Sequence, residues 1–240
     1  MHEVYTYDFE QFLAATNEKE VLLEEIARDV DEAQPSSLLD IGAGNGDLSI
    51  PLSRKVPQYT AVEKNPLYVE VLKKAGIKVK DGVFPLTLQD RYDFILASHV
   101  ISYADGTMKA FVDSAWSHLN DNGRFLIVTY RGEEDDWTQL RGELGFDVGT
   151  ANREGFKALR EQLEKLGTLD IRKVQTLVRT STSQEMIAAL SFVASNGIPE
   201  KRQQFMEQER GLSQILEDSY QDKDGYFFPF QHFLLKTHKP

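Results

Sequence analysis

Apolar runs and amphipathic stretches alternate along most of this 240-residue chain. The runs that are typical of strands lie at residues 37–42, 59–64, 77–82, 92–98 and 123–130, and stretches with helical periodicity lie at 46–56, 65–76 and 105–120. Strands that alternate with helices of this length form βαβ units, in which successive strands run parallel and the helices cover the sheet. The sequence therefore predicts an α/β fold with a mostly parallel, doubly wound sheet.

The two ends of the chain depart from this alternation. Residues 9–30 have apolar side chains at helical spacing, so we expect one or two helices before the first strand, ended by Pro35. The last third predicts a helix over 152–167, a strand over 168–180, a mainly helical stretch over 182–219 and a closing aromatic strand over 226–238. We interpret the late helical stretch as an insert that covers something, rather than as a separate domain.

The sequence DIGAGNG places Gly42, Gly44 and Gly46 at alternate positions between the first strand and the first helix. Glycine adopts positive φ readily and lets a ligand approach the backbone, and doubly wound folds bind nucleotide-like ligands at this crevice. Dinucleotide-binding turns have the spacing Gly-x-Gly-x-x-Gly instead, and here the anionic Asp47 stands where a phosphate would lie. Glu63 ends the second predicted strand, where an acidic side chain accepts hydrogen bonds from a ribose diol. The pattern therefore indicates an adenosine ligand without a diphosphate.

Composition argues against several classes of function. The net charge of −11 opposes binding to nucleic acid, whose protein partners generally present a basic face. The chain contains no cysteine, which excludes disulfides, thiolate nucleophiles and cysteine-ligated zinc. The sequence has neither a run of about 18 apolar residues nor a signal-peptide pattern at its start, so we expect no membrane span and a cytoplasmic location.

Five segments together resemble the motifs of class I S-adenosylmethionine-dependent methyltransferases. They are LLDIGAGNGDLSIPL, AVEKNP, KDG, YDFILASHVISY and NDNGRFLIVTY, and they follow the family's order over residues 36–130. The resemblance implies S-adenosylmethionine as cofactor, with Asp40 and the glycine turn at its methionine end, Glu63 at the ribose hydroxyls and Asp81 near the adenine. The implied cofactor-binding residues are Asp40, Gly42, Ala43, Gly44, Glu63, Lys64, Asp81, Gly82 and Ser98.

The same resemblance implies a Rossmann-like methyltransferase fold, with seven strands in a sheet that ends in an antiparallel hairpin. We expect one methyltransferase domain over residues 1–240, made of an N-terminal helical cap (1–35), a cofactor-binding core (36–181), a helical insert (182–222) and a final strand (223–240). We expect the protein to be a monomer or a homodimer.

A narrower resemblance, to histamine N-methyltransferase and its relatives, extends over the N-terminal helices, the segment around His99, the sequence DDWTQL and the helical insert. It implies that Glu18 contacts an amine substrate, that Trp137 forms an aromatic wall of the pocket, and that His99 replaces a glutamine that binds substrate. Tyr103 is a fourth candidate for this pocket. An asparagine of that family falls at about Pro229 here, so the acceptor need not be histamine.

Each of these side chains also has a structural interpretation. Glu18 stands in the first turn of a predicted helix, where a carboxylate complements the helix dipole. Tyr103 and Trp137 are equally typical of core aromatic residues. His99 directly follows the fourth predicted strand, at the sheet edge where ligands bind, and this position favours a site role over a structural one.

Methyl transfer from a sulfonium needs alignment and exclusion of water more than it needs a catalytic triad. The sequence has no evident carboxylate cluster for Mg²⁺, and we expect no metal site. It therefore predicts an enzyme that methylates a nitrogen of a small amine or imidazole-like molecule. Two alternatives stay open: a methyltransferase that acts on a small carboxylate or phenolic hydroxyl, and a dehydrogenase-like nucleotide-binding protein.

Overall fold

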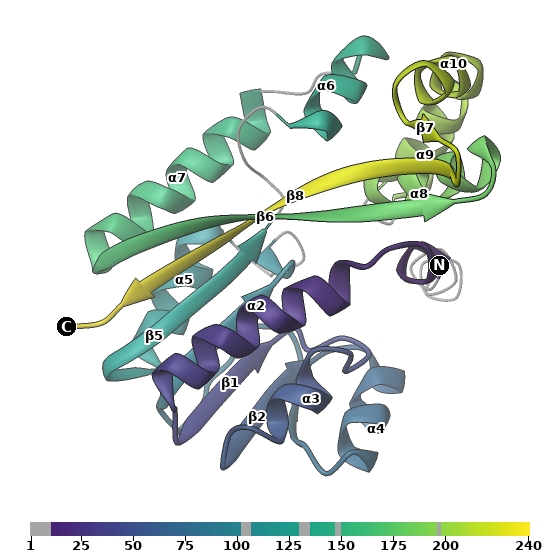
Figure 1. Ribbon diagram of the computed structural model, residues 1–240. Helices are drawn as coiled ribbons and strands as arrows, with labels where there is room; N and C mark the ends of the chain where they lie inside the picture. The colour runs from purple at the N-terminus through teal and green to yellow at the C-terminus, as the bar shows by residue number, and fades with distance from the viewer. Residues whose placement is uncertain (1–10, 102–106, 130–134, 147–149, 196–197) are drawn as a thin grey trace. The chain divides into compact units, whose positions relative to one another are not determined.

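The computed structural model describes residues 11–101, 107–129, 135–146, 150–195 and 198–240 (Figure 1). The helices in these ranges are α2 (Glu18–Ala33), α3 (Ser49–Ser53), α4 (Pro66–Lys74), α5 (Met108–Ser117), α6 (Asp136–Glu143), α7 (Thr150–Leu166), α8 (Ser183–Ser195), α9 (Pro199–Met206) and α10 (Glu209–Ser219). The strands are β1 (Ser37–Ile41), β2 (Gln58–Glu63), β3 (Lys78–Asp81), β4 (Tyr92–Ser98), β5 (Leu119–Thr129), β6 (Thr168–Thr180), β7 (Gln221–Asp222) and β8 (Gly225–His238). No helix among the described residues has both the length and the apolar character that a membrane span requires.

The strands form one sheet in the order β3-β2-β1-β4-β5-β8-β6, with the short β7 beside β8. Neighbouring strands from β3 to β5 pair in parallel, whereas β8 runs antiparallel to β5. The predicted α/β class with a mostly parallel, doubly wound sheet is confirmed. The seven expected strands form the main path of the sheet, and β7 is an addition that the sequence did not predict.

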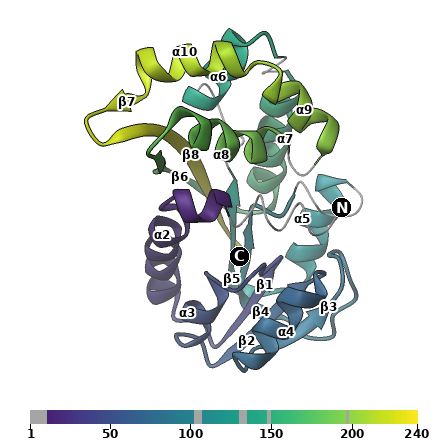
Figure 2. The same ribbon diagram turned by 90° about the vertical axis from the view of Figure 1, so that its right-hand side faces the viewer.

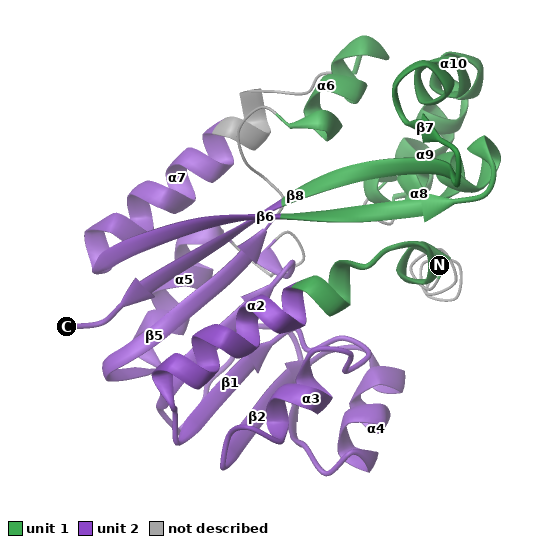
Figure 3. Cartoon of the chain, in the orientation of Figure 1, with its two compact units in different colours: residues 1–21, 133–151, 175–231 green, residues 22–132, 152–174, 232–240 purple. Residues whose placement is uncertain are grey.

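The chain divides into two compact units (Figure 3). Unit 1 comprises residues 1–21, 133–151 and 175–231, and unit 2 comprises residues 22–132, 152–174 and 232–240. The helix α2 and the long strands β6 and β8 each contribute residues to both units. The single methyltransferase domain over 1–240 stays a prediction.

In unit 2, consecutive residues of the central strands face two different apolar layers. Leu39 of β1 packs into a layer with the buried side chains of α5 and α7, whereas Leu38 packs into one with those of α2, α3 and α4. This period of two is the pleat of a strand that is buried on both faces. Figures 1 and 2 show α2 and α5 on opposite sides of the sheet.

Unit 1 has a separate core that is rich in aromatic residues. It joins the helices α6, α8, α9 and α10 to the part of β8 that belongs to this unit. The three helices α8 to α10 confirm the mainly helical stretch that the sequence predicts over 182–219.

α4 begins where the predicted helical stretch over 65–76 begins, whereas α3 is shorter than expected. The Asn65 side chain accepts a hydrogen bond from the Leu67 backbone N–H at 3.0 Å, and Pro66 occupies the first turn. The helix expected over 46–56 is reduced to Ser49–Ser53, because Gly46 adopts φ +92°, outside the helical region.

The Asp93 side chain links the starts of three strands in unit 2. Its carboxylate accepts hydrogen bonds from the backbone N–H groups of Ser36 and Ser37, both at 3.0 Å, and from the Asn120 side-chain amide at 2.8 Å. Burial raises the pKa of Asp93, but these hydrogen bonds and that of the Ser37 hydroxyl outweigh burial and hold the pKa below its ordinary value.

We expect the contribution of Asp93 to stability to depend on pH. Because the pKa is depressed in the folded state, the contribution is complete above the ordinary value of about 3.9 and is lost as the pH falls through the folded value. Asp93→Asn should therefore lower the free energy of unfolding at pH 7 and cost progressively less below about pH 4. Urea denaturation of both proteins across this range measures the difference, and an equal loss at pH 7 and pH 3 would contradict the assignment.

Candidate functional site

The glycine turn follows β1 directly in unit 2. Gly42, Gly44 and Gly46 all adopt positive φ, at +76°, +59° and +92°. A Cβ added at Gly42 would lie 2.5 Å from Cγ2 of Val100, so only glycine lets the segment after β4 approach the turn. A Cβ added at Gly44 would meet nothing within 4 Å. Val100 therefore packs tightly against the turn at Gly42, whereas the backbone of Gly44 borders open space.

Glu63 holds the glycine turn from the end of β2. Its Oε2 accepts a hydrogen bond from the Gly44 backbone N–H at 2.8 Å, and its Oε1 accepts bonds from the N–H groups of Lys64 at 2.9 Å and Asn65 at 2.7 Å. The carboxylate is buried and fixed in orientation by these charge-assisted bonds. A ribose diol that bound to Glu63, as the sequence predicts, would contact the same carboxylate that holds the turn.

Asp40 lies on β1, two residues before Gly42, and its side chain is buried. Its Oδ2 accepts hydrogen bonds from the Ser49 hydroxyl at 2.5 Å and the Tyr59 hydroxyl at 2.7 Å. Burial, and then the negative charge of Asp40, raise the pKa of the Tyr59 phenol well above its ordinary value. These bonds tie α3 and β2 to β1 and so support the turn. The predicted contact of Asp40 with the cofactor stays a prediction.

The remaining predicted cofactor residues also lie at the C-terminal edge of the parallel strands. Asp81 ends β3 and pairs in register with Glu63. The N–H of Gly82 donates to the Glu63 carbonyl at 3.0 Å, and an added Cβ on Gly82 would meet nothing within 4 Å. Ser98 ends β4. The structure thus brings the glycine turn, two carboxylates and Ser98 to one edge, where doubly wound folds bind their ligands.

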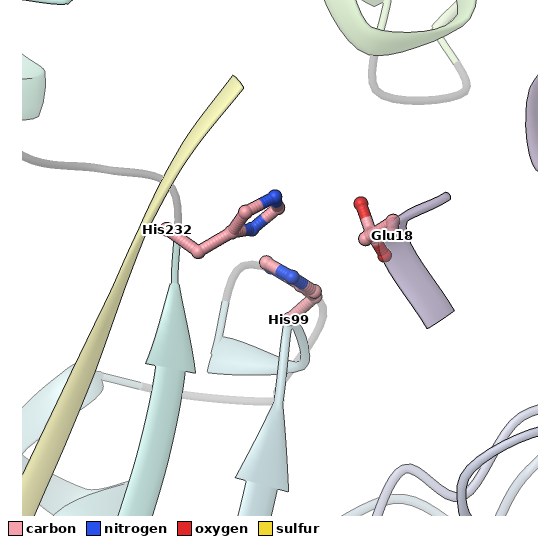
Figure 4. A group of neighbouring side chains, drawn as sticks. All are labelled: Glu18, His99 and His232. Carbon is pink, nitrogen blue, oxygen red and sulfur yellow. The ribbon is translucent and has the colours of Figure 1, made fainter. Parts of the chain in front are cut away.

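His99 follows Ser98 at this edge. Its backbone adopts φ +54°, and its N–H donates to the Val128 carbonyl of β5 at 2.9 Å. Its ring packs against the ring of His232 from β8, with centroids 5.1 Å apart and planes at 66° (Figure 4). His232 is completely buried. The site role predicted for His99 stays a prediction, but the structure adds a second imidazole beside it.

His232 lies beside the predicted site residue His99 but was not itself predicted, although a signal was present. From Phe228 through Phe230 to His232 every second residue of the closing strand is buried, and burial is then continuous to Thr237. A histidine in an otherwise apolar inward-facing row needs a polar partner or a role.

The other candidates for the acceptor pocket belong to unit 1. Glu18 is the first residue of α2, is buried, and accepts a hydrogen bond from the Lys19 ammonium at 3.0 Å. Trp137 of α6 is buried within the aromatic core of its own unit, with ring centroids 5.6 Å from Phe230 and 5.9 Å from Phe205. Tyr103 lies outside the described residues. The substrate roles of all three stay predictions.

Comparison with known proteins places this architecture in a family. A family model described as a methyltransferase domain matches residues 14–175. A probable ribosomal RNA small subunit methyltransferase A of Methanosphaera stadtmanae is 34% identical over 71 residues, and a ubiquinone biosynthesis O-methyltransferase of Methylobacterium sp. is 30% identical over 103 residues. These matches cover 30% and 39% of this chain but only 25% and 40% of the two relatives.

Solved structures share the fold over most of the chain. The YcgJ protein of Bacillus subtilis has a TM-score of 0.60 at 17% identity, covering 90% of this chain and 98% of that one. The N-methyltransferase NodS of Bradyrhizobium japonicum, in complex with S-adenosyl-L-homocysteine, has a TM-score of 0.51 at 12% identity, covering 88% of this chain and 81% of that one. At these identities the likeness shows the fold alone.

The family model covers more than half of the chain, including the glycine turn and the carboxylates at the strand ends. The open space over Gly44 and Gly82 and the carboxylates of Glu63 and Asp81 fit the nucleoside of the cofactor that the sequence predicts. The chain therefore belongs to the methyltransferase domain family.

Proposed function

We propose that this enzyme methylates a nitrogen of a small amine or imidazole-like molecule. The observation that carries the proposal is the position of His99, directly after β4 and beside the glycine turn on which its neighbour Val100 packs. A cofactor bound beyond these strand ends presents its methyl group at this edge of the sheet. The acceptor atom must come to the same place, so the imidazole of His99 is suited to meet it.

Deprotonation is the step for which an amine acceptor needs help. An ammonium group has no lone pair, so a nearby base must take its proton before the nitrogen can attack. A neutral imidazole is a suitable acceptor near neutral pH. We assign this step to the imidazole of His99.

The remaining tasks are to bind the acceptor and to exclude water. The resemblance to histamine N-methyltransferase supports a role for Glu18 as the counter-ion of a cationic amine and for Trp137 as an apolar wall. The cofactor supplies the electrophilic methyl group, and the protein contributes alignment, which is worth up to roughly 7 to 11 kcal/mol of the barrier.

Glu18→Gln should separate substrate binding from cofactor binding. Loss of the carboxylate charge is expected to raise the KM for the amine about 10-fold or more, since a hydrogen bond to a charged group contributes about 1.5–3 kcal/mol, and to leave the affinity for S-adenosylhomocysteine nearly intact. The matched control is Glu20→Gln, an exposed carboxylate in the same first turn of α2. Equal losses of substrate and cofactor affinity in Glu18→Gln would mean that Glu18 is structural.

An oxygen acceptor is the second candidate, because one relative is named as an O-methyltransferase. Transfer of a labelled methyl group to a panel of small amines, imidazoles, carboxylates and phenols tests both candidates. Product on nitrogen supports the proposal, whereas product on oxygen alone overturns it. RNA belongs in the panel because another relative is named as a ribosomal RNA methyltransferase, although the net charge of −11 opposes an RNA substrate.

A further inference from the structure

The pairing of His99 with His232 is a chemical feature that methyl transfer does not require. One ring nitrogen of each lies within 4.8 Å of a ring nitrogen of the other, although the two residues come from distant segments of the chain. His232 is fully buried on β8. Imidazole nitrogens are among the commonest protein ligands of divalent transition metals.

Both imidazoles of unit 2 are held by contacts with β5, the strand between β4 and β8. The N–H of His99 is held by the Val128 carbonyl of β5 at 2.9 Å. Phe233, next to His232, pairs with Thr129 of the same strand. Because β4, β5 and β8 are consecutive in the sheet, the ladders fix the backbones that carry the two rings. A metal site requires ligands that rigid elements hold in this way.

We propose that His99 and His232 bind a divalent transition-metal ion of the Zn²⁺ type. Both imidazoles belong to unit 2, so their geometry lies within one compact unit. Imidazole ligands suit Zn²⁺, Co²⁺ or Ni²⁺, whereas Mg²⁺ and Ca²⁺ take oxygen ligands.

Two protein ligands leave further coordination positions open on such an ion. A hydroxyl or amine that occupied one of these positions would lose its proton more easily. The inference changes one part of the proposed function, because an imidazole nitrogen that binds the ion cannot also take the proton of the amine. Metal binding is measured without cofactor and without acceptor, so its outcome is separate from that of the methyl-transfer assay.

The test is titration of the full chain with ZnCl₂ by calorimetry, after removal of metal with a chelator. We expect saturable binding of one ion per chain. His99→Asn keeps a residue that tolerates positive φ, and His232→Phe continues the aromatic row of its strand, so both variants are designed to fold. Each should weaken Zn²⁺ binding about 100-fold or more, beyond the 10- to 100-fold that loss of an outer-shell partner costs.

His118→Asn and His238→Asn are the matched controls, since both remove a histidine of unit 2 that is outside the proposed ligand set. Titration with Co²⁺ gives a second measurement on the unmodified protein, because nitrogen ligands change its visible absorption. Absence of saturable Zn²⁺ binding, or binding that His99→Asn and His232→Phe leave unchanged, would overturn the site.

Discussion

Gly44→Val is expected to abolish binding of S-adenosylhomocysteine, the product form of the cofactor. Gly44 is the point of the turn where an added Cβ meets open space, and its N–H is held by Glu63 at 2.8 Å. We expect the cofactor to fill this space beside Gly44, which holds no protein atoms. A branched side chain there would occupy it, so calorimetric titration should detect no binding at concentrations that saturate the unmodified protein.

A second substitution separates this steric effect from backbone strain. Gly44 has φ +59° and Gly76, in the turn between α4 and β3, has φ +82°, and an added Cβ meets nothing within 4 Å at either. Valine at either position adopts a left-handed conformation that costs roughly 1–2 kcal/mol. Both variants should therefore lose similar stability, while only Gly44→Val loses cofactor binding. Retained binding in a folded Gly44→Val protein would move the cofactor site elsewhere.

The central part of the fold was predictable because its determinants are local. The apolar runs at 37–42 and 92–98 gave β1 and β4 nearly to the residue, and β6 coincides with the predicted strand over 168–180. The Asn65 and Pro66 pair marked the start of α4 by capping chemistry alone. Each of these signals acts within a few residues, so no knowledge of the tertiary structure was needed.

The boundaries that failed depend on contacts between distant segments. β5 begins at Leu119 rather than at Gly123, because Tyr92 pairs with Leu119 and the register then shifts before Phe94 pairs with Arg124. Asn122 takes φ +62° inside this irregularity, between the predicted helix over 105–120 and the predicted strand over 123–130. The division into two units was also hidden, because it separates residues within the continuous elements α2, β6 and β8.

The candidate site, too, was predictable from the sequence only where its contacts are local. The glycine turn and Glu63 form one local motif, and their hydrogen bond joins two positions that the parallel pairing of β1 and β2 brings together. The expectation of no metal site rested on a search for carboxylate clusters. The His99 and His232 pair arises only because β8 inserts beside β5 in the sheet, and no local pattern around either residue indicates the other.

Loss of the Asp29 side chain is expected to lower the free energy of unfolding of unit 2 strongly. Its side chain, on α2, is only 2% exposed, and its carboxylate oxygens lie 2.7 Å from Nη2 of Arg172 on β6 and 2.8 Å from Nζ of Lys236 on β8. The side chain of Lys236 is itself only 11% exposed. Without Asp29, Arg172 keeps Glu25 at 3.0 Å, but Lys236 keeps only the longer contacts with the exposed carboxylates of Glu32 and Asp170. A charge that loses its close partner in a poorly solvated place costs more than the pair contributes while intact.

Asp29→Ala should accordingly lower the free energy of unfolding by about 3–5 kcal/mol, a large share of the roughly 5–15 kcal/mol that stabilises a typical domain. Asp31→Ala, on the same helix, removes a carboxylate that pairs with Lys55 at 2.8 Å while both side chains are substantially exposed, and it should cost about 0–1 kcal/mol. Trp116 lies in unit 2 and Trp137 in unit 1, so urea denaturation followed by tryptophan fluorescence in a Trp137→Phe background reports on unit 2. A small and equal loss in both aspartate variants would mean that water reaches the charges of Asp29, Arg172 and Lys236, because only solvent can make a buried pair as dispensable as an exposed one.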